Sequence, residues 1–160
     1  MYAQLLEEVS ALLLAQEATV AVAESCTGGL LGHWLTNVPG SSGYFLGGLI
    51  CYSVESKRDV LGMRAETLQR YGAVSAETAE EMAARARAIF AATYALAITG
   101  IAGPAPGDAG EPVGLVHIGL ATATGQVHET HQWQGNRLEN KESAARAALS
   151  LLLRRLQEVA

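Results

Sequence analysis

One short segment constrains the fold of this chain more than any other: an apolar run that leads directly into a glycine-containing turn. Residues 19–23 read Thr-Val-Ala-Val-Ala, a β-rich run, and Glu24-Ser-Cys-Thr-Gly-Gly29 follows at once. Residues 30–36 then have the pattern of a helix, which should end before Asn37-Val-Pro-Gly40. A strand that passes through a turn into a helix is typical of α/β proteins, in which helices cover the faces of a sheet.

The rest of the chain continues the alternation of helices and strands and then changes character. We expect further helices at residues 3–16, around 57–59, from Ser75 to 92 and at 137–156, and strands at 45–53, 94–99, 115–121 and 127–133. Residues 100–114 are rich in glycine and proline and should form a loop. The last two strands flank Thr124-Gly125, which indicates a β-hairpin. The sequence therefore predicts a three-layer α/β/α fold with a mixed sheet.

Composition narrows the class of protein. The chain has 160 residues, of which 49% are hydrophobic and 17% charged, so we expect one globular domain and exclude intrinsic disorder. Its net charge of −5 argues against a nucleic-acid partner. No apolar run reaches the length of about 18 residues that a membrane span needs, and no signal peptide is apparent. Only two cysteines are present, which fits a reducing cytoplasm.

Ser25 is the first candidate for a catalytic residue. A side chain on a turn from strand to helix is exposed at the carboxyl end of the sheet, where α/β proteins bind ligands. The first N–H groups of the next helix can hold an oxyanion or a phosphate, and Gly28 and Gly29 let a substrate approach the backbone. The alternative is that Ser25 or Thr27 only caps the helix. Cys26 and, in reserve, Ser42 are competing nucleophiles.

A serine nucleophile needs a base, and the four histidines are poorly placed to provide one. His33 falls in a helix, His117 in the middle of a strand, and His128 and His131 should face opposite sides of a strand. That offset also argues against a metal site. Lys57 is a better candidate, because burial or nearby cations can lower the pKa of a lysine. Its ordinary alternative is a solvated residue on a helix, and spacing alone does not pair it with Ser25.

Two further segments have features of a binding site. The segment Thr99-Gly100-Ile-Ala-Gly103 leaves a strand with a hydroxyl and two glycines, and it forms either the wall of a pocket or only a tight strand exit. Arg137 and Lys141 place two cations on the first turns of the last helix, where the helix dipole disfavours positive charge. A bound anion would relieve this conflict. Alternatively, Glu139 and Glu142 balance two exposed cations.

Several short motifs occur in order along the chain. They are Ala23-Glu-Ser-Cys-Thr-Gly-Gly29, Pro39-Gly-Ser-Ser42, Tyr52-Ser53 with Lys57, Gly72-Ala-Val-Ser75, Thr99-Gly-Ile-Ala-Gly-Pro104 and Pro112-Val-Gly114. Together they resemble the CinA C-terminal domain family over nearly the whole chain. The resemblance implies one such domain at residues 1–160, in the stand-alone form, with a roughly five-stranded mixed sheet and a homodimer or higher homo-oligomer.

The resemblance also implies an activity and roles for particular residues. Stand-alone members include amidohydrolases that convert nicotinamide mononucleotide to nicotinate mononucleotide and ammonia in pyridine nucleotide salvage, without a metal or a cofactor. In this chain the nucleophile would be Ser25, the base Lys57 and the helper Tyr52. Arg137 would lie near the substrate phosphate. The other substrate-binding residues implied are Thr27, Gly28, Gly29, Thr99, Gly100, Gly103 and Lys141.

The chain departs from the family pattern at three places, and two other functions stay open. Val54 stands where many relatives have asparagine, residues 105–109 differ from the usual glycine-rich segment, and Lys141 replaces an arginine. One alternative function is a non-catalytic nucleotide-binding or interaction module of the competence and damage-inducible type. The other is an amidase for a different small amide.

Overall fold

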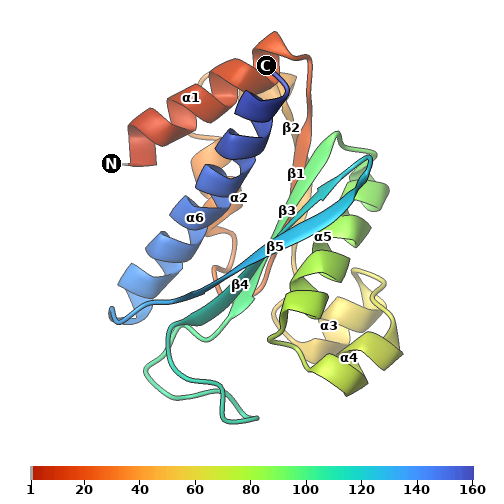
Figure 1. Ribbon diagram of the computed structural model, residues 1–160, viewed down its shortest axis with the longest axis vertical. Coiled ribbons are helices and arrows are strands. Elements are labelled where there is room, and N and C mark those ends of the chain that lie inside the picture. The colour runs from red at the N-terminus through yellow and green to blue at the C-terminus, as the bar shows by residue number, and fades with distance from the viewer. Residues whose placement is uncertain (1) are drawn as a thin grey trace.

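A computed structural model describes residues 2–160, and its centre is a five-stranded sheet in the order β2-β1-β3-β4-β5 (Figure 1). The strands are β1 (Val20–Glu24), β2 (Phe45–Ile50), β3 (Tyr94–Gly100), β4 (Leu115–Thr122) and β5 (Gly125–Gln132). β1 pairs in parallel with β2 and β3, whereas β3–β4 and β4–β5 are antiparallel. The predicted mixed sheet and late hairpin are confirmed.

Helices cover both faces of the sheet, as Figure 1 shows. On one face lie α1 (Tyr2–Ala15), α2 (Leu30–Leu35) and α6 (Arg137–Glu158); on the other lie α3 (Val54–Asp59), α4 (Ala65–Tyr71) and α5 (Ala76–Phe90). A 3-10 turn, η1 (Ser41–Gly43), precedes β2. The buried residues form one hydrophobic cluster on each face. The predicted three-layer α/β/α fold is therefore confirmed.

The central strands carry large side chains on one face and small ones on the other. The large residues Val20 and Val22 of β1 point into the cluster that α1, α2 and α6 cover, whereas the alternate residues Ala21 and Ala23 belong to the cluster under α5. β3 follows the same rule, since its alanines also lie on the α5 side. Small residues on one face allow the alanine-rich α5 to pack closely on the sheet, because side chains alternate between the faces of a strand.

Most local predictions hold, but the end of β2 and helix α4 differ from expectation. Ser75 caps α5 as expected, since its hydroxyl accepts a hydrogen bond from the N–H of Thr78 over 3.1 Å. β2 ends at Ile50, three residues before the expected end, and α4 was not predicted.

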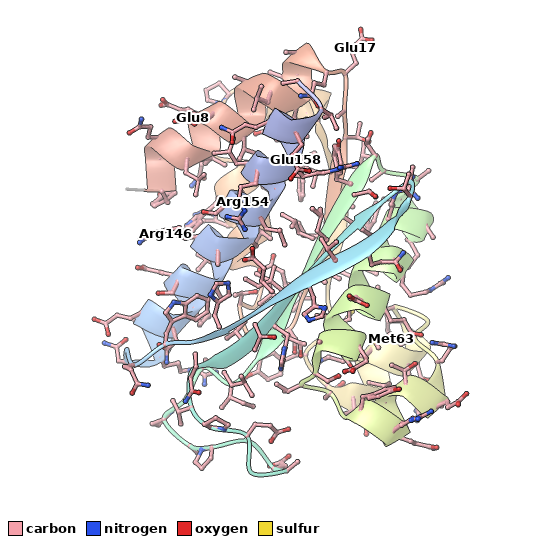
Figure 2. The ribbon with its side chains drawn as sticks, viewed as in Figure 1. Glu8, Glu17, Met63, Arg146, Arg154 and Glu158 are labelled. Carbon is pink, nitrogen blue, oxygen red and sulfur yellow. The ribbon has the colours of Figure 1, made fainter. Side chains whose placement is uncertain are left out.

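The outer face of α6 carries Arg146, Arg154 and Glu158 (Figure 2). No helix of residues 2–160 combines the length and apolar character needed to cross a membrane.

The order of the parallel strands determines where a ligand can bind. The chain leaves β1 for β2 on one side and then returns to β3 on the other side of β1. In open α/β sheets, the carboxyl ends of strands at such a reversal diverge and leave a crevice for ligands. β1 and β3 end at Glu24 and Gly100, which places the turn that contains Ser25 beside the loop that begins at Gly100.

Candidate active site

Ser25 is the first residue after β1, and the sheet holds its backbone. Its N–H donates to the carbonyl oxygen of Ile98 in β3 over 2.9 Å, and its own carbonyl accepts the N–H of Gly28 over 3.1 Å. Gly28 and Gly29 have φ angles of 61° and 103°, in the left-handed region that favours glycine. The chain thus turns sharply from strand to helix and leaves the Ser25 side chain 7% exposed.

Neither Ser25 nor Thr27 caps helix α2. The cap position is Gly29, which has no side chain, and the carboxylate of Glu24 accepts the N–H groups of Leu31 and Gly32 instead, each over 2.9 Å. The Thr27 hydroxyl also donates to this carboxylate, over 2.6 Å. The alternative interpretation of Ser25 as a helix cap is therefore wrong, and its hydroxyl is free for another partner.

That partner is Lys57, 32 residues further along the chain. The Nζ atom of Lys57 lies 2.8 Å from Ser25 Oγ, 2.7 Å from the carbonyl oxygen of Cys51 and 3.3 Å from that of Tyr52. Helix α3 brings the lysine inward, and the hydroxyl of Ser53 caps this helix by accepting the N–H of Ser56. The solvated alternative is wrong, since Lys57 is only 1% exposed.

Burial lowers the pKa of Lys57 from its ordinary value of 10.5, because a charged ammonium is costly to remove from water; the nearby Cys51 and Cys26 thiols oppose this in part. A neutral amine has two hydrogens and one lone pair. The two backbone carbonyls can accept the two hydrogens, and the lone pair then faces Ser25 Oγ. This arrangement suits a general base that takes the proton of the serine hydroxyl.

A cavity of about 560 Å³ opens in front of this pair. Its wall includes Ser25 and Lys57 on one side and every residue from Thr99 to Asp108 on another. Its charged residues are Lys57, Asp108 and Arg137. Asp108 belongs to the loop between β3 and β4, and sequence analysis did not assign it to the site.

Arg137, the first residue of α6, also lines this cavity. Its Nη1 donates to the carbonyl oxygen of Gly103 over 2.6 Å, and its Nη2 donates to the Tyr52 hydroxyl over 3.1 Å. Tyr52 contacts Lys57 through its carbonyl, not its phenol, and its side chain is 61% exposed. Glu139 does not balance Arg137, because it forms a capping box with Asn136 at the start of α6.

The structure brings only part of the predicted binding set to the cavity. Gly100 and Gly103 line it, and Thr99 lines it while its hydroxyl donates to the Ala73 carbonyl over 2.6 Å. Thr27 faces Glu24 instead. Gly28 and Gly29 do not contribute to the cavity wall, and neither does Lys141, whose Nζ would lie 3.8 Å from a Cβ placed on Gly28.

The competing nucleophiles are less favourable. Cys26 lines the cavity, but burial raises the pKa of its thiol to about 11, so it is protonated at neutral pH. Ser42 lies in η1, outside the cavity wall. The histidines also lie elsewhere: His128 contacts Glu80 of α5, whereas His131 contacts Glu129 and stacks on Trp133. Within residues 2–160, no group of three or more His, Cys, Asp or Glu residues could hold a metal ion.

Two residues that sequence analysis missed, Glu24 and Asn140, hold segments of the site in place without lining the cavity. Glu24 carries the hydrogen bonds described above, and Asn140 of α6 is 1% exposed. The amide of Asn140 donates to the carbonyls of Ala102 and Gly135, each over 3.0 Å, and accepts the N–H of Gly135 over 3.1 Å. In the sequence, each of the two is only a polar residue beside apolar ones. Exposed residues at the surface of a protein have the same pattern, so it did not indicate burial.

Comparison with known sequences places the chain in a family. Residues 2–156 match the CinA C-terminal domain. A CinA-like protein of Solibacter usitatus is 49% identical over 148 residues, and one of Desulfosudis oleivorans is 50% identical over 151 residues. These alignments cover 92% and 93% of this chain but only 36% of each relative. The chain therefore spans about a third of the length of these relatives.

Comparison with solved structures gives the same result. A CinA superfamily protein from Klebsiella pneumoniae superposes with a TM-score of 0.94 and 32% identity, over 97% of both chains. A competence/damage inducible protein from Agrobacterium tumefaciens superposes with a TM-score of 0.91 and 38% identity, over 96% of this chain and 94% of its own. This chain belongs to the CinA C-terminal domain family.

Proposed function

We propose that this protein is an amidohydrolase that converts nicotinamide mononucleotide to nicotinate mononucleotide and ammonia, with Ser25 as nucleophile and Lys57 as base. The observation that carries the proposal is the 2.8 Å hydrogen bond between Lys57 Nζ and Ser25 Oγ at the edge of a cavity. A lysine buried against a serine, with its pKa lowered by that burial, has little structural reason to be there. A base for the serine hydroxyl gives it a function.

The reaction follows from this geometry in two halves. Ser25 Oγ attacks the carboxamide carbon while the Lys57 amine takes the hydroxyl proton. The tetrahedral intermediate then expels ammonia, which receives that proton from the Lys57 ammonium. In the second half, Lys57 takes a proton from a water that attacks the ester on Ser25. Release of the carboxylic acid returns the proton to Ser25 Oγ, so the net change consumes one amide and one water.

Backbone donors are available for the oxyanion. Among residues 2–160, the N–H groups of Cys26 and Thr27 donate to no backbone or side-chain oxygen. They directly follow the nucleophile, and the N–H of the residue after a nucleophilic serine serves this purpose in other α/β enzymes. We assign the Cys26 N–H to the developing oxyanion, because such donors contribute most when they are fixed before the reaction.

The charges of the cavity fit a nucleotide. A volume of about 560 Å³ lies within the usual range of small-ligand sites, roughly 300–1,000 Å³. Arg137 uses two of its five N–H donors on Gly103 and Tyr52, which leaves others for a phosphate at the cavity mouth. Asp108 is available for the ribose hydroxyls. We also expect a homodimer or a higher homo-oligomer, which sedimentation would reveal.

Ammonia release from nicotinamide mononucleotide tests the activity. We expect turnover by the wild type and none above background in Ser25→Ala or Lys57→Met, with Ser42→Ala as the matched serine control that keeps full activity. Loss in both variants would support the pair, whereas turnover in Ser25→Ala would assign the nucleophile to another residue. A folded wild type that binds the nucleotide without turnover would favour a non-catalytic binding module. Faster turnover of free nicotinamide would contradict a phosphate site at Arg137.

A further inference from the structure

Glu24 is a buried carboxylate immediately before the nucleophile, and the mechanism above gives it no role. It is 1% exposed and is the last residue of β1. Its Oε1 accepts the Thr27 hydroxyl over 2.6 Å and the Leu31 N–H over 2.9 Å, and its Oε2 accepts the Gly32 N–H over 2.9 Å. The side chain thus reaches across the whole turn that holds Ser25 and fastens the start of α2 to the end of β1.

The main chain of Glu24 is connected to the other member of the pair. Its carbonyl oxygen accepts the N–H of Cys51 over 2.8 Å. The carbonyl of Cys51 in turn accepts a hydrogen from Lys57 Nζ over 2.7 Å. Glu24 is therefore bonded covalently to Ser25 and linked to Lys57 through one intervening residue, so a shift of Glu24 would change the distance between the serine and the lysine.

A carboxylate is the group that this turn requires. The cap position of α2 is a glycine, so the first N–H groups of the helix have no local side-chain acceptor. Three donors converge on the two oxygens of Glu24, and hydrogen bonds to an ionised acceptor are about twice as strong as neutral ones.

We infer that Glu24 is a positioning residue that sets the distance between Ser25 Oγ and Lys57 Nζ by clamping the turn between β1 and α2. The inference rests on Ser25 being the nucleophile of the proposed function. Glu24 does not line the cavity, so it does not contact the substrate. Its carboxylate accepts hydrogen bonds from Thr27, Leu31 and Gly32, so Glu24 acts on the pair through the backbone of the turn.

The decisive variant is Glu24→Gln, which keeps the size of the side chain but replaces one acceptor oxygen by an NH2 group. We expect kcat for nicotinamide mononucleotide to fall about 10- to 100-fold, since a displacement of about 1 Å in an active site costs about that much. KM should stay at the wild-type value, and so should the pH midpoint of kcat/KM. Glu8→Gln, the same change at an exposed glutamate of α1, is the matched control and should have no effect (Figure 2).

A second measurement does not depend on the substrate. A small fluorophosphonate reacts with an activated serine, and mass spectrometry of the protein gives the rate of phosphonylation at Ser25. We expect this rate to fall at least about 10-fold in Glu24→Gln, for the same geometric reason. If wild-type Ser25 reacts but the nucleotide is not hydrolysed, the proposed substrate is wrong and the comparison of rates still decides the role of Glu24.

Wild-type kcat and wild-type phosphonylation in Glu24→Gln would overturn the inference, as would a change confined to KM. An unreactive Ser25 in the wild type would overturn it together with the proposed nucleophile. Should Glu24→Gln fail to fold by circular dichroism, Thr27→Val replaces it, because this change removes one donor to the carboxylate and retains both backbone N–H groups. Thr27→Val should then slow phosphonylation several-fold, and an unchanged rate would contradict the positioning role.

Discussion

Arg137 Nη2 donates to the Tyr52 hydroxyl over 3.1 Å, although the two residues are 85 positions apart in the chain. The same guanidinium is bound to the Gly103 carbonyl, so one side chain connects the start of α6, the turn before α3 and the loop after β3. All three segments contribute residues to the wall of the cavity. Arg137 is therefore fixed in place before any ligand arrives.

Arg137→Ala should weaken the use of phosphorylated substrate in particular. A hydrogen bond to a charged group contributes about 1.5–3 kcal/mol, so KM for nicotinamide mononucleotide should rise roughly 10- to 100-fold. Nicotinamide riboside, which lacks the phosphate, should be affected much less. Steady-state kinetics with both compounds measure the difference, and Arg146→Ala on the outer face of α6 is the control (Figure 2). Equal losses for the two compounds would refute a phosphate contact.

Tyr52→Phe separates two roles for this residue. The phenol is bound to Arg137, so its loss should loosen the arginine and raise KM several-fold with little change in kcat. A helper that takes part in proton transfer, which is one form of the role implied by the family resemblance, would instead require kcat to fall. Measuring kcat and KM separately decides between the two roles.

The pH dependence of the reaction should report on Lys57. Only the neutral amine can accept the serine proton, so kcat/KM should rise with pH and level off once Lys57 has lost its proton. Because burial lowers the pKa of Lys57, the midpoint should lie below 10.5. Activity is then lost as pH falls through that midpoint. A rate profile recorded up to about pH 11 tests this. A rate that is still rising steeply between about pH 10 and 11, without levelling off, would contradict the buried base.

Cys26→Ala should leave most of the activity intact, in contrast to Ser25→Ala. Burial raises the pKa of the Cys26 thiol to about 11, so little thiolate exists at neutral pH. Alkylation of Cys26 by iodoacetamide should accordingly be slow at pH 7 and increase about 10-fold per pH unit toward that pKa, since the thiolate is the reactive form. Rapid alkylation near pH 7, followed by peptide mapping, would show that the thiol is activated after all.

Asn140→Ala should destabilise the fold and disturb the site. The substitution leaves two carbonyls and one N–H without their partner in a buried position, and each such loss costs about 1–3 kcal/mol. Urea unfolding measures the effect on the free energy of unfolding. Asn136→Ala, which removes the cap of the same helix, is the comparison and should cost about 0.5–2 kcal/mol without raising KM. Equal effects of both variants on KM would mean that Asn140 does not organise the loop at Ala102.

Local patterns in the sequence predicted the layers of the fold. The hairpin around Thr124-Gly125 is a local feature, because its two strands are neighbours along the chain. The apolar run at residues 19–23 indicated a buried strand, whereas its parallel partner β3 lies more than 70 residues away. α4 was missed because its residues 65–71 are mostly polar and exposed and give no strong periodicity. Its position depends on packing against α5 and not on its own pattern.

The candidate site was predictable in its residues but not in its contacts. Spacing alone did not pair Ser25 with Lys57. Ser25 follows β1 and Lys57 lies in the helix after β2, so the two meet only because these strands pair side by side. Glu24 and Asn140 were missed for a related reason. Their hydrogen-bond partners include backbone groups, such as the Leu31 N–H and the Ala102 carbonyl, which no residue type in the sequence reveals. Arg137 stood out because its charge opposes the dipole of its own helix, a conflict visible within one turn.

The hydrogen bond from the Ser25 N–H to Ile98 has a consequence for the order of events during protein synthesis. Ser25 and Lys57 leave the ribosome before β3, since the strand that fixes the serine backbone is made about 70 residues after Ser25, and Arg137 follows later still. A nascent chain that ends before β3 therefore contains Ser25 and Lys57 without the strand that holds the Ser25 backbone. If Ser25 acts as proposed, its reactivity should develop only after the parallel part of the sheet is complete.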